Sequence, residues 1–385
     1  MVDQFVFDFP VRVLFGPGSL QKLHDEKLPG KKALIAISGG GSMKRHGHLA
    51  KLEAELDAAG VEHVLYEGVK PNPTTDSVDD GAQMAIDNGC DFIIALGGGS
   101  TMDAAKIMAK LVTNGGKCWD YSFTASSGGK YFTKPGLPLV CITTAAGTGS
   151  EVDVYSVITN EETQEKSALA GDYPVLSIVD CELMMTVPPT FTAYQGMDAF
   201  YHAAETIVNI NGHHMSEAFA MKAVELVAKY LPRAVADGSD KEARNGLAVA
   251  NTMAAYYMIL TSEHTLEHAI GSFHELPHGA GLIMISHAYF DLLASRECCE
   301  DKLVAMAKAM GMDDAKCGKD FVAALDKLIA DVNCDGLKMS DYGIERDELP
   351  AIVKKYHEVV GGNINSNPCE ITDDDVLAIL ENSYK

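Results

Sequence analysis

The sequence predicts a parallel α/β domain followed by an all-α domain. Through the first half of the 385 residues, short apolar runs alternate with amphipathic segments, the order typical of parallel strands joined by helices. From about Pro188 onward, long helical patterns replace the strand-like runs. The pair Pro188–Pro189 marks the boundary, because a residue that precedes proline disfavours helical geometry. We therefore expect domains at 1–187 and 188–385.

The individual elements follow from the same patterns. Five runs have the length and the β-branched composition of buried strands: 33–37, 63–68, 92–97, 139–144 and 176–180. Amphipathic helical segments at 47–60 and 77–89 lie between the first of these strands, and further helical patterns occur at 216–231 and 301–311. Strands that are apolar throughout predict a parallel sheet covered by helices on both faces.

Composition excludes several classes of protein. The chain is 47% apolar and 22% charged, close to the globular average, so it can bury a large core. A formal net charge of −23 argues against nucleic acid as a partner, because no basic surface would neutralise phosphates. The N-terminus lacks the pattern of a signal peptide, and no apolar run is long enough to span a membrane. Nine cysteines without a C-x-x-C motif fit a reduced compartment, so we expect a cytoplasmic protein.

A glycine-rich turn follows the predicted strand 92–97. Gly98, Gly99 and Ser100 lead into what looks like the start of a helix. Glycines let backbone N–H groups approach an anion, and a helix N-terminus adds a positive partial charge, so this turn could hold a pyrophosphate. The pattern is neither G-x-G-x-x-G nor a P-loop. A tight strand-to-helix turn is the alternative.

Two further stretches point to a dinucleotide. In NAD-specific folds an acidic residue after an early strand binds the ribose hydroxyls and repels a 2′-phosphate. The loop 39-GGGSMKRHG-47 has no acid there but offers Ser42, Lys44 and Arg45, which favours NADP(H). A glycine turn with exposed basic residues is the alternative. The stretch 143-TTAAGTGSEVD-153 follows another predicted strand, and ligands of open α/β sheets gather at such strand ends.

The helical half contains two groups of metal-ligating residues. Asp198 and His202 are four residues apart, as are His264 and His268, so each pair lies on one face of a helix; His278 follows. Imidazole and carboxylate ligands together suit zinc or ferrous iron. The letters 264-HTLEH-268 also match the H-x-x-E-H motif of some zinc peptidases. The motif alone does not decide between a peptidase and another metal enzyme.

Seven landmarks occur in order along the chain: 15-FGPGSL-20, 71-PNPT-74, 97-GGGSTMDAAK-106, 143-TTAAGTGSEV-152, 179-VDCEL-183, 196-GMDAFYH-202 and the stretch 264–279. Together they resemble the iron-containing (group III) alcohol dehydrogenase family over nearly the whole length. The loop 39–47 and the form His264-x-x-Glu267-His268 look most like the butanol-dehydrogenase-like branch, whose members commonly use NADP(H). Cys181 stands where many members have proline, at a position that carries no chemistry.

The resemblance implies a metal site and a catalytic role for neighbouring residues. The family's four metal ligands fall on Asp198, His202, His264 and His278. Fe2+ is the ion expected, with Zn2+ as the second choice. His268 falls beside the nicotinamide, where it could relay a proton, and Glu267 is expected to support the site. The resemblance therefore excludes a peptidase.

The family's nicotinamide site also maps onto this chain. The expected cofactor-binding residues are Gly39, Gly40, Gly41, Ser42, Asn72, Gly98, Gly99, Ser100, Asp103, Thr143, Thr144, Thr148, Lys166 and Leu183. Asp103 is placed near the nicotinamide and is a further catalytic candidate.

The implied activity is hydride transfer between NADP(H), with NAD(H) as the alternative, and a primary alcohol or its aldehyde. We expect a homodimer with its active site in the cleft between the two domains. A dehydroquinate-synthase-like or glycerol-dehydrogenase-like enzyme on the same fold is the second interpretation. The lyase would need a cluster of basic residues for its acidic substrate, which the helical half lacks. A cofactor-binding protein without turnover is the third, and the complete ligand set argues against it.

Overall fold

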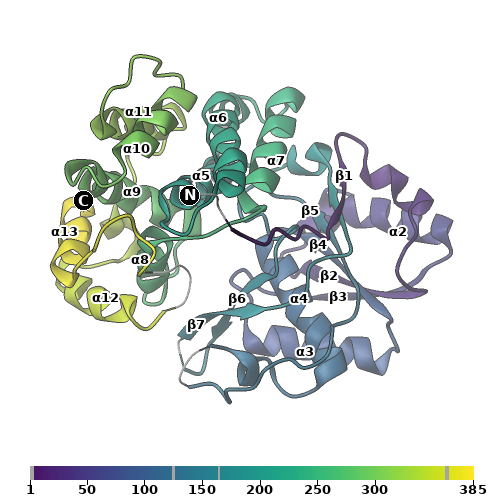
Figure 1. Ribbon diagram of the computed structural model, residues 1–385. Coiled ribbons are helices and arrows are strands. Elements are labelled where there is room, and N and C mark those ends of the chain that lie inside the picture. Colours follow the sequence, from purple (N-terminus) through teal and green to yellow (C-terminus); the bar gives the residue numbers. More distant parts are fainter. Residues whose placement is uncertain (1–3, 124–125, 164, 360–363) are drawn as a thin grey trace. The chain divides into compact units, whose positions relative to one another are not determined.

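The computed structural model describes residues 4–123, 126–163, 165–359 and 364–385 (Figure 1). The chain divides into two compact units. One unit is Asp8–Thr186, and the other is Val187–Lys385 together with the first described residues, 4–7. Within the described ranges, no helix combines the length and the apolarity needed to cross a membrane.

The unit Asp8–Thr186 is built on a parallel sheet. Its elements are β1 (Arg12–Phe15), η1 (Leu20–Asp25), β2 (Lys32–Ser38), α1 (Ser42–Arg45), α2 (His48–Ala59), β3 (Glu62–Val69), α3 (Thr75–Asp87), β4 (Phe92–Gly97), α4 (Gly99–Asn114), η2 (Cys118–Tyr121), β5 (Leu139–Thr143), β6 (Tyr155–Asn160), β7 (Glu165–Ala170), β8 (Leu176–Val179) and η3 (Cys181–Met184). Six of the described strands pair in the order β1-β8-β5-β4-β2-β3, and every pairing is parallel. The predicted parallel sheet is therefore confirmed.

Successive residues of the central strands face opposite layers of helices. On β2, Ala33 and Ile35 pack with η1 and α2, whereas Leu34 and Ala36 pack with α3 and α4. β4 repeats the alternation, and all its residues are buried. Figure 1 shows α2 and α3 on opposite sides of the sheet. This two-sided burial explains why these strands are apolar at every position.

A second, two-stranded sheet was not predicted. Strands β6 and β7 pair antiparallel, with Thr159 opposite Lys166. Their exposed and buried residues alternate, and several are polar. The edge strand β1 was also missed, because it has only four residues, none of which is buried.

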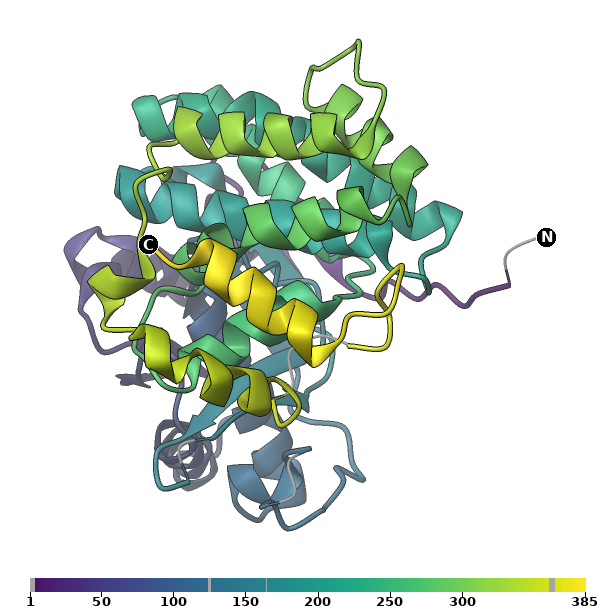
Figure 2. The same cartoon turned by 90° about the vertical axis from the view of Figure 1, so that its left-hand side faces the viewer.

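The other unit is helical, as predicted. Its elements are α5 (Pro189–Val208), α6 (His214–Ala236), α7 (Lys241–Ala255), α8 (Ser262–Gly271), α9 (His278–Ser295), α10 (Glu300–Ala309), α11 (Gly318–Asp331), η4 (Met339–Tyr342), η5 (Arg346–Glu348), α12 (Leu349–Tyr356) and α13 (Asp373–Ser383). Helix α9 packs against α5, α8, α11 and α13. Figure 2 shows α13, in yellow, at the front of this unit.

Residues 4–7 pack against the helical unit through aromatic rings. Phe5 stacks on His213 with ring centroids 3.8 Å apart. Phe7 stacks on Phe219 and Tyr257. The sequence analysis assigned this segment to the first domain, because nothing local in the sequence shows which rings will meet.

Candidate metal centre and cofactor loops

Three helices of the helical unit carry the predicted metal ligands. Asp198 and His202 lie on α5, His264 lies on α8, and His278 is the first residue of α9. Every residue of α8 from Ser262 to Ile270 is buried, so its polar side chains face other protein groups rather than solvent.

Two glycines allow α9 to begin close to the other two helices. A Cβ atom on Gly279 would lie 2.2 Å from the carbonyl oxygen of Tyr194 on α5. A Cβ atom on Gly281 would lie 2.7 Å from Cγ of Glu267 on α8. Only glycine permits such close contact with backbone and side chain. The first turn of α9 therefore brings His278 to the residues of α5 and α8.

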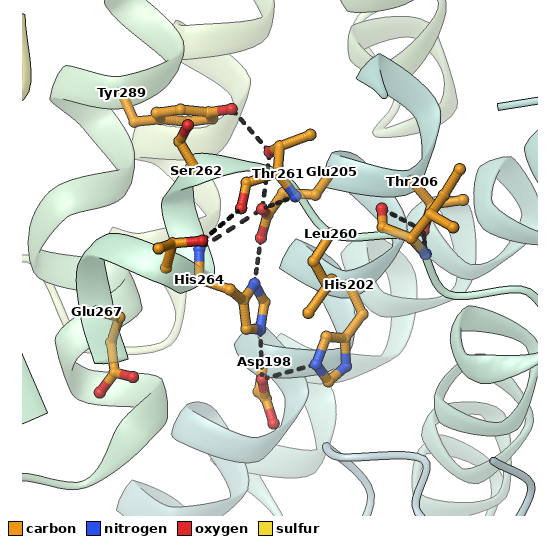
Figure 3. A network of polar contacts seen from close by, with 12 residues as sticks. Asp198, His202, Glu205, Thr206, Leu260, Thr261, Ser262, His264, Glu267 and Tyr289 are labelled. Atoms are coloured by element: carbon orange, nitrogen blue, oxygen red, sulfur yellow. Dashed lines mark hydrogen bonds and ion pairs between the residues drawn. The ribbon is translucent and has the colours of Figure 1, made fainter. Parts of the chain in front are cut away.

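Three of the ligand side chains, all imidazoles, surround the carboxylate of the fourth, Asp198 (Figure 3 shows Asp198, His202 and His264). The Nε2 atoms of His202, His264 and His278 lie 3.4, 3.5 and 3.5 Å from Oδ1 of Asp198. Around an ion with bond lengths of about 2.0–2.1 Å, tetrahedral ligand atoms lie about 3.3–3.4 Å apart. The spacing to Asp198 is thus the spacing that a single transition-metal ion requires.

Unsatisfied polar atoms support the same conclusion. Asp198 Oδ1 and His264 Nε2 are buried without a hydrogen-bond partner, an arrangement that costs free energy unless a ligand satisfies both atoms. The ligand atoms of Asp198, His264 and His278 all lie within 4.8 Å of one another. His202 joins them through Asp198, and its ring stacks on that of His264 with centroids 4.7 Å apart. These residues fit a divalent ion.

The carboxylates and imidazoles of this site shift one another's pKa values. Burial alone would raise the pKa of Asp198, but the rings of His202, His278 and His264 lower it below its ordinary value. Burial lowers the pKa of His202 to about 4. Burial also acts to lower the pKa of His264, but Glu205 and Asp198 raise it to about 10. A divalent cation would replace the proton that these carboxylates hold on His264.

Two glutamates contact the outer nitrogens of the ligand histidines. Glu205 contacts Nδ1 of His264, and Glu267 contacts Nδ1 of His278. Glu267 therefore lies where a supporting residue would. The sequence analysis missed Glu205, although it lies three residues after His202 and seven after Asp198, on the same face of α5.

His268 lies beside the ligands on α8 and is buried. Its ring centroid is 5.2 Å from that of His278 and 6.5 Å from that of His264. Nitrogen and oxygen atoms of Glu267, His268 and His278 also lie within 4.8 Å of one another. The structure thus brings His268 to the metal centre, and its proton-relay role stays a prediction.

Most of the predicted cofactor residues follow neighbouring strands of the parallel sheet. Gly39, Gly40 and Gly41 follow β2, and Gly98, Gly99 and Ser100 follow β4 at the start of α4. Thr143 ends β5, Thr144 and Thr148 come after it, and Leu183 lies in η3 after β8. The carboxyl ends of parallel strands meet at one edge of a sheet, where ligands of such folds bind.

Two predicted cofactor residues, Asn72 and Lys166, belong to segments that are linked through Thr159 of the second sheet. Asn72 has a positive φ of 51° in the loop before α3. In the same loop the carbonyl oxygen of Pro73 accepts a hydrogen bond from the backbone N–H of Thr159. Thr159 is the cross-strand partner of Lys166.

Asp103 is tied into a buried polar network. Its carboxylate accepts hydrogen bonds from Ser150 Oγ at 2.6 Å and from the backbone N–H of Val157 at 2.9 Å. Lys106 donates to the same Ser150 hydroxyl at 2.8 Å and forms an ion pair with Asp153. Burial raises the pKa of Asp103 to about 6. These bonds anchor α4 to β6, and contact between Asp103 and nicotinamide stays a prediction.

The loop after β2 has an acidic neighbour that the sequence analysis did not foresee. Glu67, near the end of β3, pairs with Lys44 at 2.6 Å. Arg45 donates to the carbonyl oxygen of Gly40 at 2.7 Å. Both cations expected to meet a 2′-phosphate therefore have protein partners, and the charge of Lys44 balances that of Glu67.

Comparison with known proteins gives the family. Residues 10–181 match the model of the iron-containing alcohol dehydrogenases, and residues 192–384 match that of the C-terminal domain of the Fe-containing alcohol dehydrogenase family. The chain belongs to the iron-containing alcohol dehydrogenase family. It is therefore an oxidoreductase that acts on alcohols or aldehydes with a nicotinamide cofactor and iron.

Individual relatives in this family cover nearly the whole chain. Alcohol dehydrogenase 4 of Schizosaccharomyces pombe is 34% identical over 98% of this chain and 88% of its own length. An NADPH-dependent butanol dehydrogenase of Clostridium saccharobutylicum is 33% identical, covering 98% of this chain and 97% of the relative. The crystal structure of an archaeal halo-thermophilic alcohol dehydrogenase from a Red Sea brine pool has a TM-score of 0.91, 33% identity and full coverage of both chains. The resemblance inferred from the sequence is confirmed.

Proposed function

We propose that this family member transfers a hydride between NADP(H) and a primary alcohol or its aldehyde, with one divalent ion per chain. The observation that carries the proposal is the convergence of three imidazole Nε2 atoms on Asp198 Oδ1 at 3.4–3.5 Å. When bound, the ion acts as a Lewis acid toward the substrate oxygen, and the nicotinamide exchanges the hydride.

The chain's own residues would bind the ion, hold the ligands and move the proton. Asp198, His202, His264 and His278 would hold the ion, with Fe2+ first and Zn2+ second. His268, one helical turn after His264, would take the proton that the alcohol loses, because a neutral imidazole can accept it and return it to solvent. The burial of α8 would keep water from the reacting groups.

The preference for NADP(H) is supported by the loop after β2. Residues 39–42 have no acidic side chain, and their backbone N–H groups and the Ser42 hydroxyl are suited to phosphate. Lys44 neutralises Glu67, which would otherwise repel the 2′-phosphate. Among the relatives, one butanol dehydrogenase is named as NADPH-dependent and another as NADH-dependent. The loop is therefore the feature on which the proposal of NADP(H) rests.

Both oxygens of Asp103 accept hydrogen bonds, one from Ser150 and one from Val157. Asp103 would therefore act near the nicotinamide by anchoring the segments that carry these two residues. We also propose that the chain forms a homodimer and that it is cytoplasmic, since nine cysteines without a C-x-x-C motif fit a reduced compartment.

A panel of alcohols tests the proposed activity. Anaerobically purified enzyme would be incubated with NADP+ and with ethanol, butanol, 1,3-propanediol and glycerol in turn, and NADPH would be followed at its absorbance maximum. A dehydrogenase of primary alcohols produces net NADPH, whereas a dehydroquinate-synthase-like lyase returns its cofactor unchanged. Turnover with glycerol alone would favour the glycerol-dehydrogenase-like alternative, and no net NADPH with any alcohol would contradict the proposal.

A further inference from the structure

His264 lies between two carboxylates that face its two ring nitrogens. Nε2 faces Asp198 Oδ1 at 3.5 Å, and Nδ1 contacts Oε1 of Glu205 (Figure 3). A histidine binds a metal through a nitrogen that carries a lone pair. Since Nε2 is the nitrogen that faces the other ligands, the ring proton of metal-bound His264 must lie on Nδ1.

Glu205 is itself held in place by hydrogen bonds from Thr261. It is fully buried on α5, and its Oε2 accepts hydrogen bonds from the backbone N–H and the hydroxyl of Thr261, each at 2.7 Å. Because the Thr261 hydroxyl gives its one proton to Glu205, it can only accept from Tyr289 OH, which lies 2.8 Å away. Tyr289 OH also lies 3.1 Å from Asn367 Oδ1. The network therefore runs from the metal ligand on α8 to the segment that precedes α13.

The network continues to helix α12 and closes on itself. Tyr356 OH donates to Ser262 Oγ at 2.7 Å, and the backbone N–H of Ser262 donates to Asn367 Oδ1 at 3.1 Å. Ser262 and Thr261 are adjacent, so the start of α8 is bonded from both sides. The backbone N–H of Thr261 can only donate and has a fixed direction, so it holds Oε2 of Glu205 in one position and leaves Oε1 facing His264.

From this arrangement we infer that Glu205 is a positioning residue that fixes His264 in the tautomer with the proton on Nδ1, and that the Thr261 backbone fixes Glu205. The inference rests on the proposed metal-dependent function. A carboxylate accepts at both oxygens, so it can take the Thr261 N–H on one side and the His264 Nδ1–H on the other. No other type of side chain of this length satisfies both partners.

Replacing Glu205 with glutamine gives a distinctive result. The backbone N–H of Thr261 can only donate, so the amide oxygen of Gln would occupy the Oε2 position. The amide NH2 group would then face His264 Nδ1 and donate to it. The ring proton would move to Nε2, and His264 would lose the lone pair that faces Asp198. The near-isosteric variant Glu205→Gln is therefore expected to fold normally but to bind metal poorly.

The test measures metal affinity and stability separately. Metal-free protein would be titrated with Zn2+ against a chromophoric chelator, and the melting temperature of the metal-free protein would be measured in parallel. Glu205→Gln is expected to weaken metal binding about 10- to 100-fold, the usual effect of losing such a partner, while its melting temperature stays close to that of the wild type. A residue with only a structural role would lower the melting temperature first.

Glu263→Gln is the matched control. Glu263 is also fully buried on α8, next to His264, and neither of its oxygens has a hydrogen-bond partner. It does not bond to a ligand histidine among the described residues. The same substitution there is expected to leave zinc affinity near the wild-type value, which separates the effect of tautomer from the effect of changing a buried glutamate.

A spectroscopic measurement on the wild type does not depend on the folding of any variant. In zinc-loaded protein labelled with 15N-histidine, His264 should show a metal-bound Nε2 and a slowly exchanging proton on Nδ1. Wild-type zinc affinity in Glu205→Gln, or metal binding of His264 through Nδ1, would overturn the inference. Wild-type enzyme that binds zinc or iron but oxidises no alcohol would instead contradict the proposed function and leave this inference standing.

Discussion

Replacing Gly99 with alanine would place a methyl group where helix α4 meets the segment after β5. The new Cβ would lie 2.5 Å from Cγ2 and 2.7 Å from Oγ1 of Thr148. Real Cβ atoms do not approach other atoms so closely, so either α4 or the segment that carries Thr148 must move. Both elements are expected to hold the cofactor.

The magnitude follows from two opposing effects. Overpacking of this kind costs about 1–3 kcal/mol, and the loss of glycine flexibility in the unfolded chain returns about 0.4–1 kcal/mol. The net cost is therefore up to about 2.6 kcal/mol, which lowers the melting temperature by up to about 10 °C for a unit of this size. Displacement of the backbone N–H groups of residues 98–100 should also weaken NADP(H) binding at least tenfold, which corresponds to about 1.4 kcal/mol.

Gly336→Ala, in the segment between α11 and η4, is the control outside the turn. Its Cβ would have no atom within 4 Å, and its φ is not positive. NADPH fluorescence titration and thermal melts of both variants provide the comparison. If Gly99→Ala bound NADPH and melted like the wild type, or like Gly336→Ala, the proposed role of this turn would be refuted.

Three further predictions concern the specificity loop and the metal centre. A Cβ at position 40 would have no atom within 4 Å, so Gly40→Asp has space for its side chain. Its carboxylate should repel the 2′-phosphate and so erode or reverse the preference for NADP+, which kcat/KM with both cofactors measures. An unchanged preference would contradict the proposed role of the loop in selecting NADP(H). His264→Ala and His278→Ala should each lose metal and activity. His287 is an exposed histidine on α9 that pairs with Asp326, so His287→Ala should keep both. Metal analysis measures the difference, and full metal content in the two ligand variants would rule out the assignment. His268→Ala should keep metal and cofactor binding but slow turnover and alter its pH dependence; an unchanged pH–rate profile would remove His268 from the mechanism.

The sequence predicts best those elements whose burial follows a simple pattern along the chain. Strands β2, β4 and β5 are buried on both faces, so their apolar runs identify them almost to the residue. Helices with one buried face, such as α3, are identified by their periodicity. The spacing of four residues shows that Asp198 and His202, and likewise His264 and His268, each share one helical face. The sequence indicates which of these residues bind the metal only through the family resemblance.

What the sequence does not show depends on contacts between distant segments. The ion pair between Lys44 and Glu67 joins residues 23 positions apart, and the contact between Glu205 and His264 joins residues 59 positions apart. The hairpin β6–β7 has mixed polarity because only part of it is covered. In each case the chemical role of the side chain is set by the partner that the fold brings to it.

Reconstitution of the metal-free enzyme tests the central claim most directly. Protein stripped of metal would be titrated anaerobically with Fe2+, and both bound iron and the rate of NADPH formation with butanol would be measured at each step. We predict that activity rises in proportion to bound iron and levels off at one ion per chain. Activity in the metal-free protein, or bound iron that restores no turnover with any primary alcohol, would contradict the account.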